Sequence, residues 1–201
     1  MRSADAITLF RIGLVFPVLY LIYLKFNPFA VVALILFTFL LDEVDGYLAL
    51  GRHENFLKYI IAEGKGKHVY APADVAKLPK YGSALDIAGD RITEFSFWIL
   101  FTYLRIIPLF VLFIVVIRDA LSDAFTHTSG KTFHNMHSKF GKIAYSHLAR
   151  GAIGASKAVT FCYLALMYMA NWPAWIGYIL VAYVITFFLL RGAAEIYEAV
   201  L

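Results

Sequence analysis

Long apolar runs alternate with short polar stretches along almost the whole chain. A helix that crosses a hydrocarbon core of about 30 Å needs about 20 mainly apolar residues. The run at 84–125 is too long for one crossing, and Arg105-Ile106-Ile107-Pro108 at its centre supplies charge and a proline where a turn would lie. The pattern therefore predicts an all-α integral membrane protein with six transmembrane helices, at 7–24, 28–50, the two halves of 84–125, 152–170 and 172–190.

Composition supports this prediction. Hydrophobic residues make up 61% of the chain, against about 45–50% in soluble globular domains, so too little polar surface remains to cover a water-soluble particle. The 201 residues suit a single domain, 1–201. Arg11 within the first apolar run, and the lack of a small-residue cleavage site, favour a membrane span over a cleaved signal peptide. Cys162, the one cysteine, lies in an apolar run and is interpreted as a buried hydrophobe.

Lysine and arginine are divided unequally between the two sides that six spans would create. Loops rich in these residues resist translocation and stay in the cytoplasm. One side has only Lys25 and Arg105, whereas the side with both termini has ten such residues in two loops: Arg52, Lys58, Lys65, Lys67, Lys77, Lys80, Lys131, Lys139, Lys142 and Arg150. We therefore expect cytoplasmic termini, and we attribute the net charge of +4 to topology rather than to nucleic-acid binding.

Two pairs of aspartates lie where a membrane helix should avoid charge. Asp42 and Asp45 are spaced i, i+3, and Asp86 and Asp90 are spaced i, i+4, so each pair projects from one face of its helix. Both pairs lie on the order of 10 Å inside the cytoplasmic ends of their spans. Four converging carboxylates without a counter-charge would repel one another, and a divalent cation resolves that conflict. Oxygen ligands favour Mg²⁺, Mn²⁺ or Ca²⁺ over zinc.

Small residues and an arginine accompany these acids. Gly46 and Ala49 follow the first pair on the same helix, and Gly82 precedes the second pair, which leaves room for a cleft. Arg52 lies within about 80° of the first aspartate around an ideal helix and can offer its guanidinium fork to phosphate oxygens. Metals, a cleft and a guanidinium together suit a diphosphate ligand.

Two other interpretations of the aspartates remain open. They would serve as ion pairs that tie helices together if Arg91, Arg118 or Arg150 were their partners, although ion pairs do not require the glycine spacing. They would also suit an ion-coupled transporter, which places acids within helices. The sequence has no internal repeat and no pair of broken helices that would support transport.

The acids and small residues together resemble the signature of the CDP-alcohol phosphatidyltransferase family. The matching order is Asp42-x-x-Asp45-Gly46-x-x-Ala49, then Arg52, then Gly82-x-x-x-Asp86-x-x-x-Asp90. Thr8-Leu9-Phe10-Arg11 is similar to the first-helix start common in that family. Arg118-Asp119 is similar to the Arg-Glu of phosphatidylglycerophosphate-synthase-like members. The resemblance covers most of the chain and is weak after Asp123.

Two features depart from the family pattern. Leu50 stands where the family has an arginine directly after the alanine, and Arg52 is the nearest arginine. The segment 53–81 separates two half-motifs that lie much closer together in the family. This segment is rich in lysine, with Gly64, Gly66 and prolines, so we expect a polar cytoplasmic insertion. Its role is open between a lid over the site and a tolerated surface insertion.

The resemblance implies a homodimeric transferase of phospholipid biosynthesis. The CDP group of a CDP-linked lipid would dock over two divalent ions, Mg²⁺ or Mn²⁺, and an alcohol would attack the lipid phosphate and release CMP. Asp42, Asp45, Asp86 and Asp90 would be metal ligands, and Asp90 would also be the catalytic base. Nucleotide-binding positions would be Gly46, Ala49, Arg52 and Gly82.

The acceptor alcohol is less well determined by the sequence. Basic residues suit a phosphorylated polyol such as glycerol 3-phosphate or inositol phosphate, and the candidates are Arg118, Lys142, Arg150, Lys157 and Arg191. Each of them would also serve as an interfacial anchor. A neutral acceptor such as serine remains open. So does the reversed reaction, in which CDP-choline or CDP-ethanolamine donates to diacylglycerol.

Overall fold

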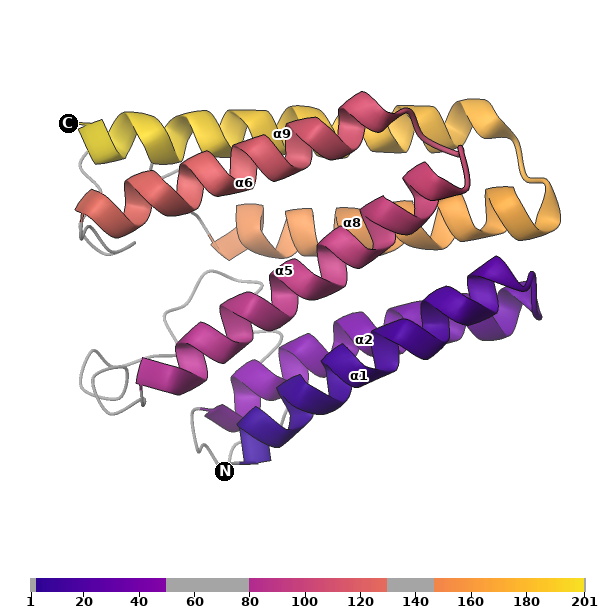
Figure 1. Cartoon of the computed structure of the whole chain (residues 1–201), viewed down its shortest axis with the longest axis horizontal. Helices are drawn as coiled ribbons and strands as arrows, with labels where there is room; N and C mark the ends of the chain where they lie inside the picture. Colours follow the sequence, from indigo (N-terminus) through magenta and orange to yellow (C-terminus); the bar gives the residue numbers. More distant parts are fainter. Residues whose placement is uncertain (1–2, 50–79, 130–146, 201) are drawn as a thin grey trace.

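The computed structural model describes residues 3–49, 80–129 and 147–200. These residues form six α-helices and no strand (Figure 1), which confirms the predicted all-α class. The helices are α1 (Ser3–Tyr23), α2 (Pro28–Ala49), α5 (Lys80–Tyr103), α6 (Leu109–Ser129), α8 (His147–Ala170) and α9 (Ala174–Val200). Each predicted span overlaps one of these helices. The predicted insertion 53–81 lies outside the described residues, except that its last two residues belong to the first turn of α5.

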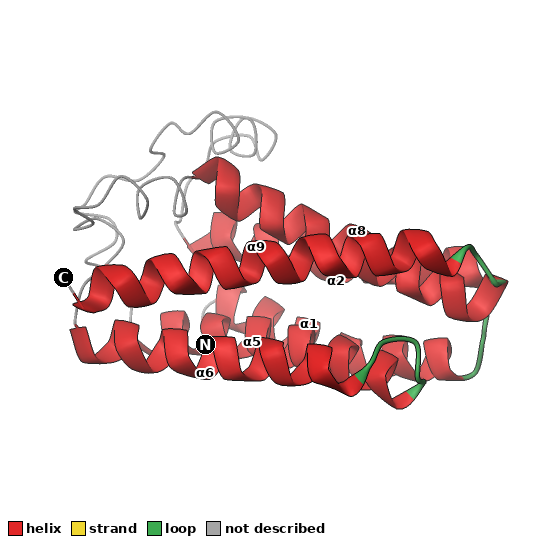
Figure 2. Cartoon of the chain, turned by 90° about the horizontal axis from the view of Figure 1, so that it is seen from above, coloured by secondary structure: helices red, strands yellow, loops and turns green. Residues whose placement is uncertain are grey.

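Three short turns join the helices in pairs at one end of the bundle, and both chain termini lie at the other end (Figures 1 and 2). Each turn contains a non-glycine residue with a left-handed backbone: Lys25 (φ 51°), Arg105 (φ 58°) and Asn171 (φ 55°). This conformation reverses the chain just after a helix end and satisfies its last carbonyl groups. The predicted turn at Arg105–Pro108 is therefore confirmed.

The start of α2 shows why the sequence turns where it does. Asn27 caps the helix, because its Oδ1 accepts hydrogen bonds from the backbone N–H groups of Phe29 (3.0 Å) and Ala30 (3.2 Å). Pro28 occupies the first helical position, where a missing N–H costs nothing. An asparagine followed by proline thus fixes both the end of the turn and the start of the helix.

Helix α1 packs against both α2 and α5, α2 packs against α8, and α9 packs against α6 and α8. One buried stripe runs down α1 with helical spacing and comprises Thr8, Arg11, Val15, Val18 and Ile22. The centre of the bundle is aromatic. Phe161 of α8 stacks on Phe97 at 4.9 Å between ring centroids and meets the edge of Trp98 at 5.0 Å. This contact joins α5 to α8.

The outer surface of the bundle is largely apolar, with large exposed hydrophobic side chains on all six helices, including Phe, Leu, Ile or Tyr on every helix except α8, where the exposed residue is Val159. Within the described residues, three helices are long and apolar enough to cross a membrane: Asp5–Tyr23, Gly151–Ala170 and Ala174–Ala194. Pro28–Asp42 in α2 is a shorter apolar segment. Helices α5 and α6 carry charged residues such as Asp86, Arg91 and Asp119. These features indicate a membrane protein.

Replacing Phe161 with alanine should destabilise the bundle strongly, because its ring fills the contact between α5 and α8. Loss of a buried phenylalanine costs about 3–5 kcal/mol, so we expect the melting temperature in detergent to fall by about 10 °C. The matched control is Phe113→Ala on α6, where the ring is exposed. Equal losses for the two variants would contradict this account of the core.

Candidate metal centre

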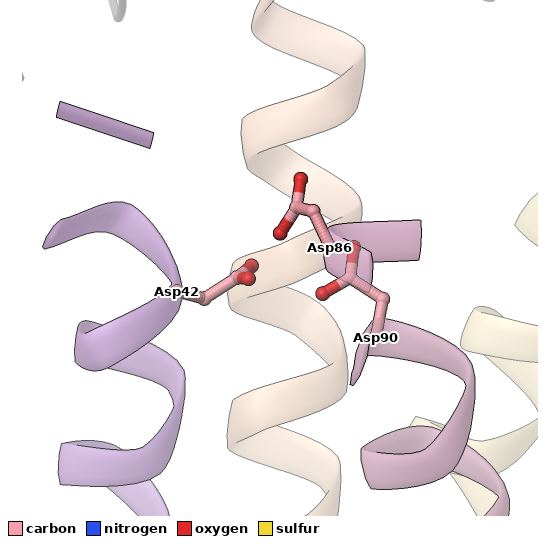
Figure 3. A group of neighbouring side chains, drawn as sticks. All are labelled: Asp42, Asp86 and Asp90. Atoms are coloured by element: carbon pink, nitrogen blue, oxygen red, sulfur yellow. The ribbon is translucent and has the colours of Figure 1, made fainter. Parts of the chain in front are cut away.

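Three of the four predicted aspartates meet near the end of the bundle that holds the chain termini. Asp42 reaches from α2, and Asp86 and Asp90 reach from successive turns of α5, with their carboxylates directed toward one another (Figure 3). One oxygen from each carboxylate lies within 4.8 Å of the other two. The chain therefore brings two separate sequence segments together in one carboxylate group, defined here as Asp42, Asp86 and Asp90.

Arg11 of α1 lies against all three carboxylates. Its Nη1 pairs with Asp42, and its Nη2 lies 2.9 Å from Asp90 Oδ1 and 3.7 Å from Asp86 Oδ1. The Arg11 side chain is only 3% exposed, whereas the Asp86 and Asp90 side chains are about half exposed. The guanidinium thus forms the buried floor of the group, and the carboxylates of α5 face outward.

This arrangement corrects one premise drawn from the sequence. The aspartates do have a counter-charge within the described residues, and it is Arg11 rather than Arg91 or Arg118. Arg91 and Arg118 instead pair with Asp119 of α6, and the side chain of Arg150 lies outside the described residues. An ion pair across helices is strongly distance-dependent, so spacing along the chain could not identify its partner.

The charges of the carboxylate group do not balance. Three carboxylates carry −3 and Arg11 carries +1, so −2 remains among these four residues. Two oxygens on opposite sides of a Mg²⁺ ion lie about 4.2 Å apart, close to the spread of the three ligand oxygens. Each carboxylate has two oxygens, so contact with Arg11 leaves acceptor capacity for another cation. The group can therefore hold a metal ion by geometry and by charge.

The remaining predicted residues of this site are only partly described. Asp45, Gly46 and Ala49 belong to the last turns of α2, and Gly82 belongs to the first turn of α5, but nothing is described beyond their backbone. Arg52 lies outside the described residues. The predicted ligand role of Asp45 and the nucleotide-binding roles therefore stay predictions.

A second charged cluster lies deeper between α5, α6 and α8. Asp119 accepts from Arg118 Nη1 at 2.5 Å and pairs with Arg91 Nη1 at 2.7 Å, and Arg91 also donates to Asp123 at 2.9 Å. Glu94 pairs with Lys157 of α8 at 2.7 Å. Three cations face three carboxylates, so these six described side chains are balanced in charge, unlike the carboxylate group.

Two of the predicted acceptor-binding residues belong to this second cluster. Arg118 and Lys157 both lie against the ring of Phe188 on α9, at 5.4 Å and 5.0 Å from its centroid. Arg118 Nε also donates to the Phe188 carbonyl at 3.1 Å. The structure thus brings Arg118 and Lys157 to one place, each already paired with a carboxylate. Lys142 lies outside the described residues, and Arg150 is described only as backbone of α8.

A large pocket lies outside both charged clusters. It has a volume of about 870 Å³ and is lined mainly by apolar residues of the α5–α6 turn and α9, including Ile106, Val111 and Val181. It is therefore at the end of the bundle opposite the chain termini. No predicted site residue lines it, and its walls offer no carboxylate for a metal ion.

Comparison with protein-family models gave no match to this chain, and comparison with curated proteins gave none either. The functional argument consequently rests on the sequence motif and on the geometry of the carboxylate group.

Sequence reasoning missed Arg11 and Gly89 as parts of this site. The signal for Arg11 was its position on the same helical stripe as Thr8, Val15 and Val18, because an arginine on a buried stripe needs an acid as partner. Gly89 immediately precedes Asp90 and is buried where α5 meets α1. A Cβ atom there would lie 2.9 Å from Arg11 Nη2 and from Thr8 Cγ2. A glycine is therefore what allows Arg11 to reach the group.

If the carboxylate group binds metal, the Asp42→Asn protein should bind Mn²⁺ at least about tenfold more weakly than the wild type, because an amide supplies no negative charge. Binding can be followed by the loss of the free Mn²⁺ signal in electron paramagnetic resonance. The matched control is Asp123→Asn, an exposed carboxylate of the second cluster, which should leave Mn²⁺ affinity unchanged. Equal affinity in Asp42→Asn and the wild type would exclude Asp42 as a ligand.

Proposed function

We propose that this protein is a divalent-metal-dependent CDP-alcohol phosphotransferase of phospholipid biosynthesis, which moves a phosphatidyl-type group from a CDP-linked lipid to an alcohol and releases CMP. The observation that carries the proposal is the convergence of Asp42, Asp86 and Asp90 from two helices with a residual charge of −2. These are the positions at which the motif resembles that family. Charge, geometry and motif thus select the same residues.

The carboxylate group would hold Mg²⁺ or Mn²⁺, with Asp45 completing a site for two ions. Bound ions would supply electrostatic stabilisation of the diphosphate and of the leaving phosphate. Asp90 would accept the proton of the attacking hydroxyl, a role that its half-exposed carboxylate supports. Gly46, Ala49 and Gly82 would leave room for the nucleotide beside these acids, and Arg52 would contact phosphate oxygens.

The proposal includes a topology. All six helices would span the bilayer, with both termini, the insertion at 53–81 and the active site on the cytoplasmic side of the cell membrane. Support comes from the lysine and arginine distribution and from the position of both termini at the end of the bundle near the carboxylates. A site at this depth, about 10 Å from the helix ends, suits one soluble substrate and one that stays in the bilayer. A homodimer is expected from the family resemblance.

For the acceptor we propose a phosphorylated polyol such as glycerol 3-phosphate or inositol phosphate. Arg118 and Lys157 would contact its phosphate, with Lys142 and Arg150 as further candidates. One support is that Arg118 and Lys157 both lie against Phe188. Another is that helix α5 connects the two charged clusters, because Asp90 of the carboxylate group and Glu94 of the second cluster are one turn apart. Because both cations are already paired, an incoming phosphate would exchange partners with Asp119 and Glu94.

Arg11 also favours a second interpretation, in which the aspartates only tie α1, α2 and α5 together. Its contacts with all three carboxylates are those of a structural ion-pair network. The exposure of the α5 carboxylates argues against this as the whole explanation, because Asp86 and Asp90 are about half exposed and can accept a cation from solution. Metal binding distinguishes the two interpretations.

The test of the proposed function is CMP release by purified protein supplied with CDP-diacylglycerol and, in parallel, with an archaeol analogue. The acceptor panel comprises glycerol 3-phosphate, inositol phosphate, inositol and serine. We expect CMP with one acceptor, dependence on Mg²⁺ or Mn²⁺, and loss of turnover in EDTA. Asp86→Asn should lower the rate on the order of 100-fold or more while the protein stays folded.

Failure of these donors would move the test to CDP-choline and CDP-ethanolamine with diacylglycerol. No CMP from any pair of substrates would contradict the proposed function, and ion-dependent flux without CMP would favour a transporter. Full activity of Asp86→Asn would remove Asp86 from the reaction.

Replacing Arg118 with alanine should raise the apparent KM for a phosphorylated acceptor about tenfold, since a charge-assisted contact to phosphate is worth about 1.5–3 kcal/mol. The KM for the CDP-linked donor should change little. The control is Arg105→Ala, which removes an exposed arginine at the opposite end of the bundle. An acceptor KM that is unchanged in Arg118→Ala would exclude Arg118 from the acceptor site.

A further inference from the structure

Arg11 and a bound metal ion would use the same three carboxylates. Metal–oxygen distances are about 2.0–2.6 Å, and Arg11 Nη2 lies 2.9 Å from Asp90 Oδ1. An ion bound to that oxygen would therefore lie within about 5.5 Å of the guanidinium nitrogen. Two positive charges at such a separation repel strongly where water is largely excluded. Water is largely excluded from Arg11, because its side chain is only 3% exposed.

The position of Arg11 is built into the packing of three helices. Helix α1 packs against both α2 and α5, and Arg11 belongs to the buried stripe of α1 and reaches the aspartates. Gly89 of α5 leaves space for its Nη2 atom. No described residue accepts a hydrogen bond from Arg11 Nε, so the side chain is held mainly by the carboxylates at its tip. A cation of this kind is tied to the acids rather than to the rest of the protein.

We propose that Arg11 is the resident counter-cation of the carboxylate group and competes with the metal ion for it. Without metal, Arg11 offsets the repulsion among Asp42, Asp86 and Asp90 and stabilises the packing of α1 against α2 and α5. When metal binds, the ion takes over that neutralisation, and the contacts of Arg11 weaken. Arg11 therefore lowers the affinity of the site for metal while it keeps the metal-free protein folded. This inference rests on the metal-binding part of the proposed function.

The decisive variant is Arg11→Gln, which keeps hydrogen-bond donors and removes the charge. We expect it to bind Mn²⁺ at least about tenfold more tightly than the wild type, a change that corresponds to about 1.4 kcal/mol. Its melting temperature without metal should fall, and the increase in melting temperature at saturating Mn²⁺ should exceed that of the wild type. A residue that merely positions the ligands would give the opposite result, because its loss would weaken metal binding. The matched control, Arg105→Gln, should change neither quantity.

A second variant acts on Arg11 without changing any charge. Gly89→Ala places a methyl group 2.9 Å from Arg11 Nη2, so it should displace the guanidinium from Asp90. We expect tighter Mn²⁺ binding and a lower metal-free melting temperature, and both changes should be smaller than those for Arg11→Gln. This variant decides the question if Arg11→Gln does not fold.

The outcomes separate this inference from the proposed function. If the wild type binds Mn²⁺ and neither variant binds it more tightly, competition by Arg11 is excluded and the metal site stands. If neither the wild type nor Arg11→Gln binds Mn²⁺ at millimolar concentration, both the inference and the proposed metal dependence are overturned. Tighter binding in Arg11→Gln, abolished again by adding Asp42→Asn, would establish that Arg11 and metal share the same carboxylates.

Discussion

The structure depends on how carboxylates inside an apolar bundle are neutralised. Carboxylates that converge repel one another unless a cation lies among them, and within the described residues Arg11 contacts all three of Asp42, Asp86 and Asp90. That contact joins α1, α2 and α5 at the end of the bundle near the chain termini. Apolar packing along the rest of α1 and the aromatic contact between α5 and α8 keep the helices in the positions that the Arg11 contact requires. The three carboxylates and Arg11 together carry −2, and this charge makes the carboxylate group suitable for a metal ion.

The two charged clusters show that neutralisation alone does not define a functional site. Arg91, Arg118 and Lys157 face Asp119, Asp123 and Glu94, so the second cluster is balanced and its acids need no further cation. The carboxylate group keeps an excess of negative charge, and its two α5 side chains are about half exposed. The balanced second cluster suits helix association and an anion that exchanges partners. The carboxylate group suits a cation that arrives from solution and a substrate bound over that cation.

Much of the fold could be predicted from local sequence, because helix ends are set by nearby residues. Asn27 and Pro28 begin α2, and the left-handed Arg105 lies in the predicted turn between α5 and α6. The aspartates were also predictable, since acids at helical spacing in apolar segments are costly. Their partner was not, because Asp42 and Arg11 are 31 residues apart and meet only through the packing of α1 on α2. The same reason explains why Arg91 and Arg118, which the alternative interpretation placed beside the aspartates, pair with Asp119 instead: side-chain direction and helix order decide which charges meet.

The most direct test of the central claim is a structure of the protein soaked in Mn²⁺, with anomalous scattering recorded at the manganese edge. The account predicts an anomalous peak within about 2.0–2.6 Å of oxygens of Asp42, Asp86 and Asp90, with Arg11 farther from those oxygens than in the metal-free state. A peak elsewhere, or no peak while Arg11 keeps all three contacts, would contradict it and leave the aspartates as a structural ion-pair network.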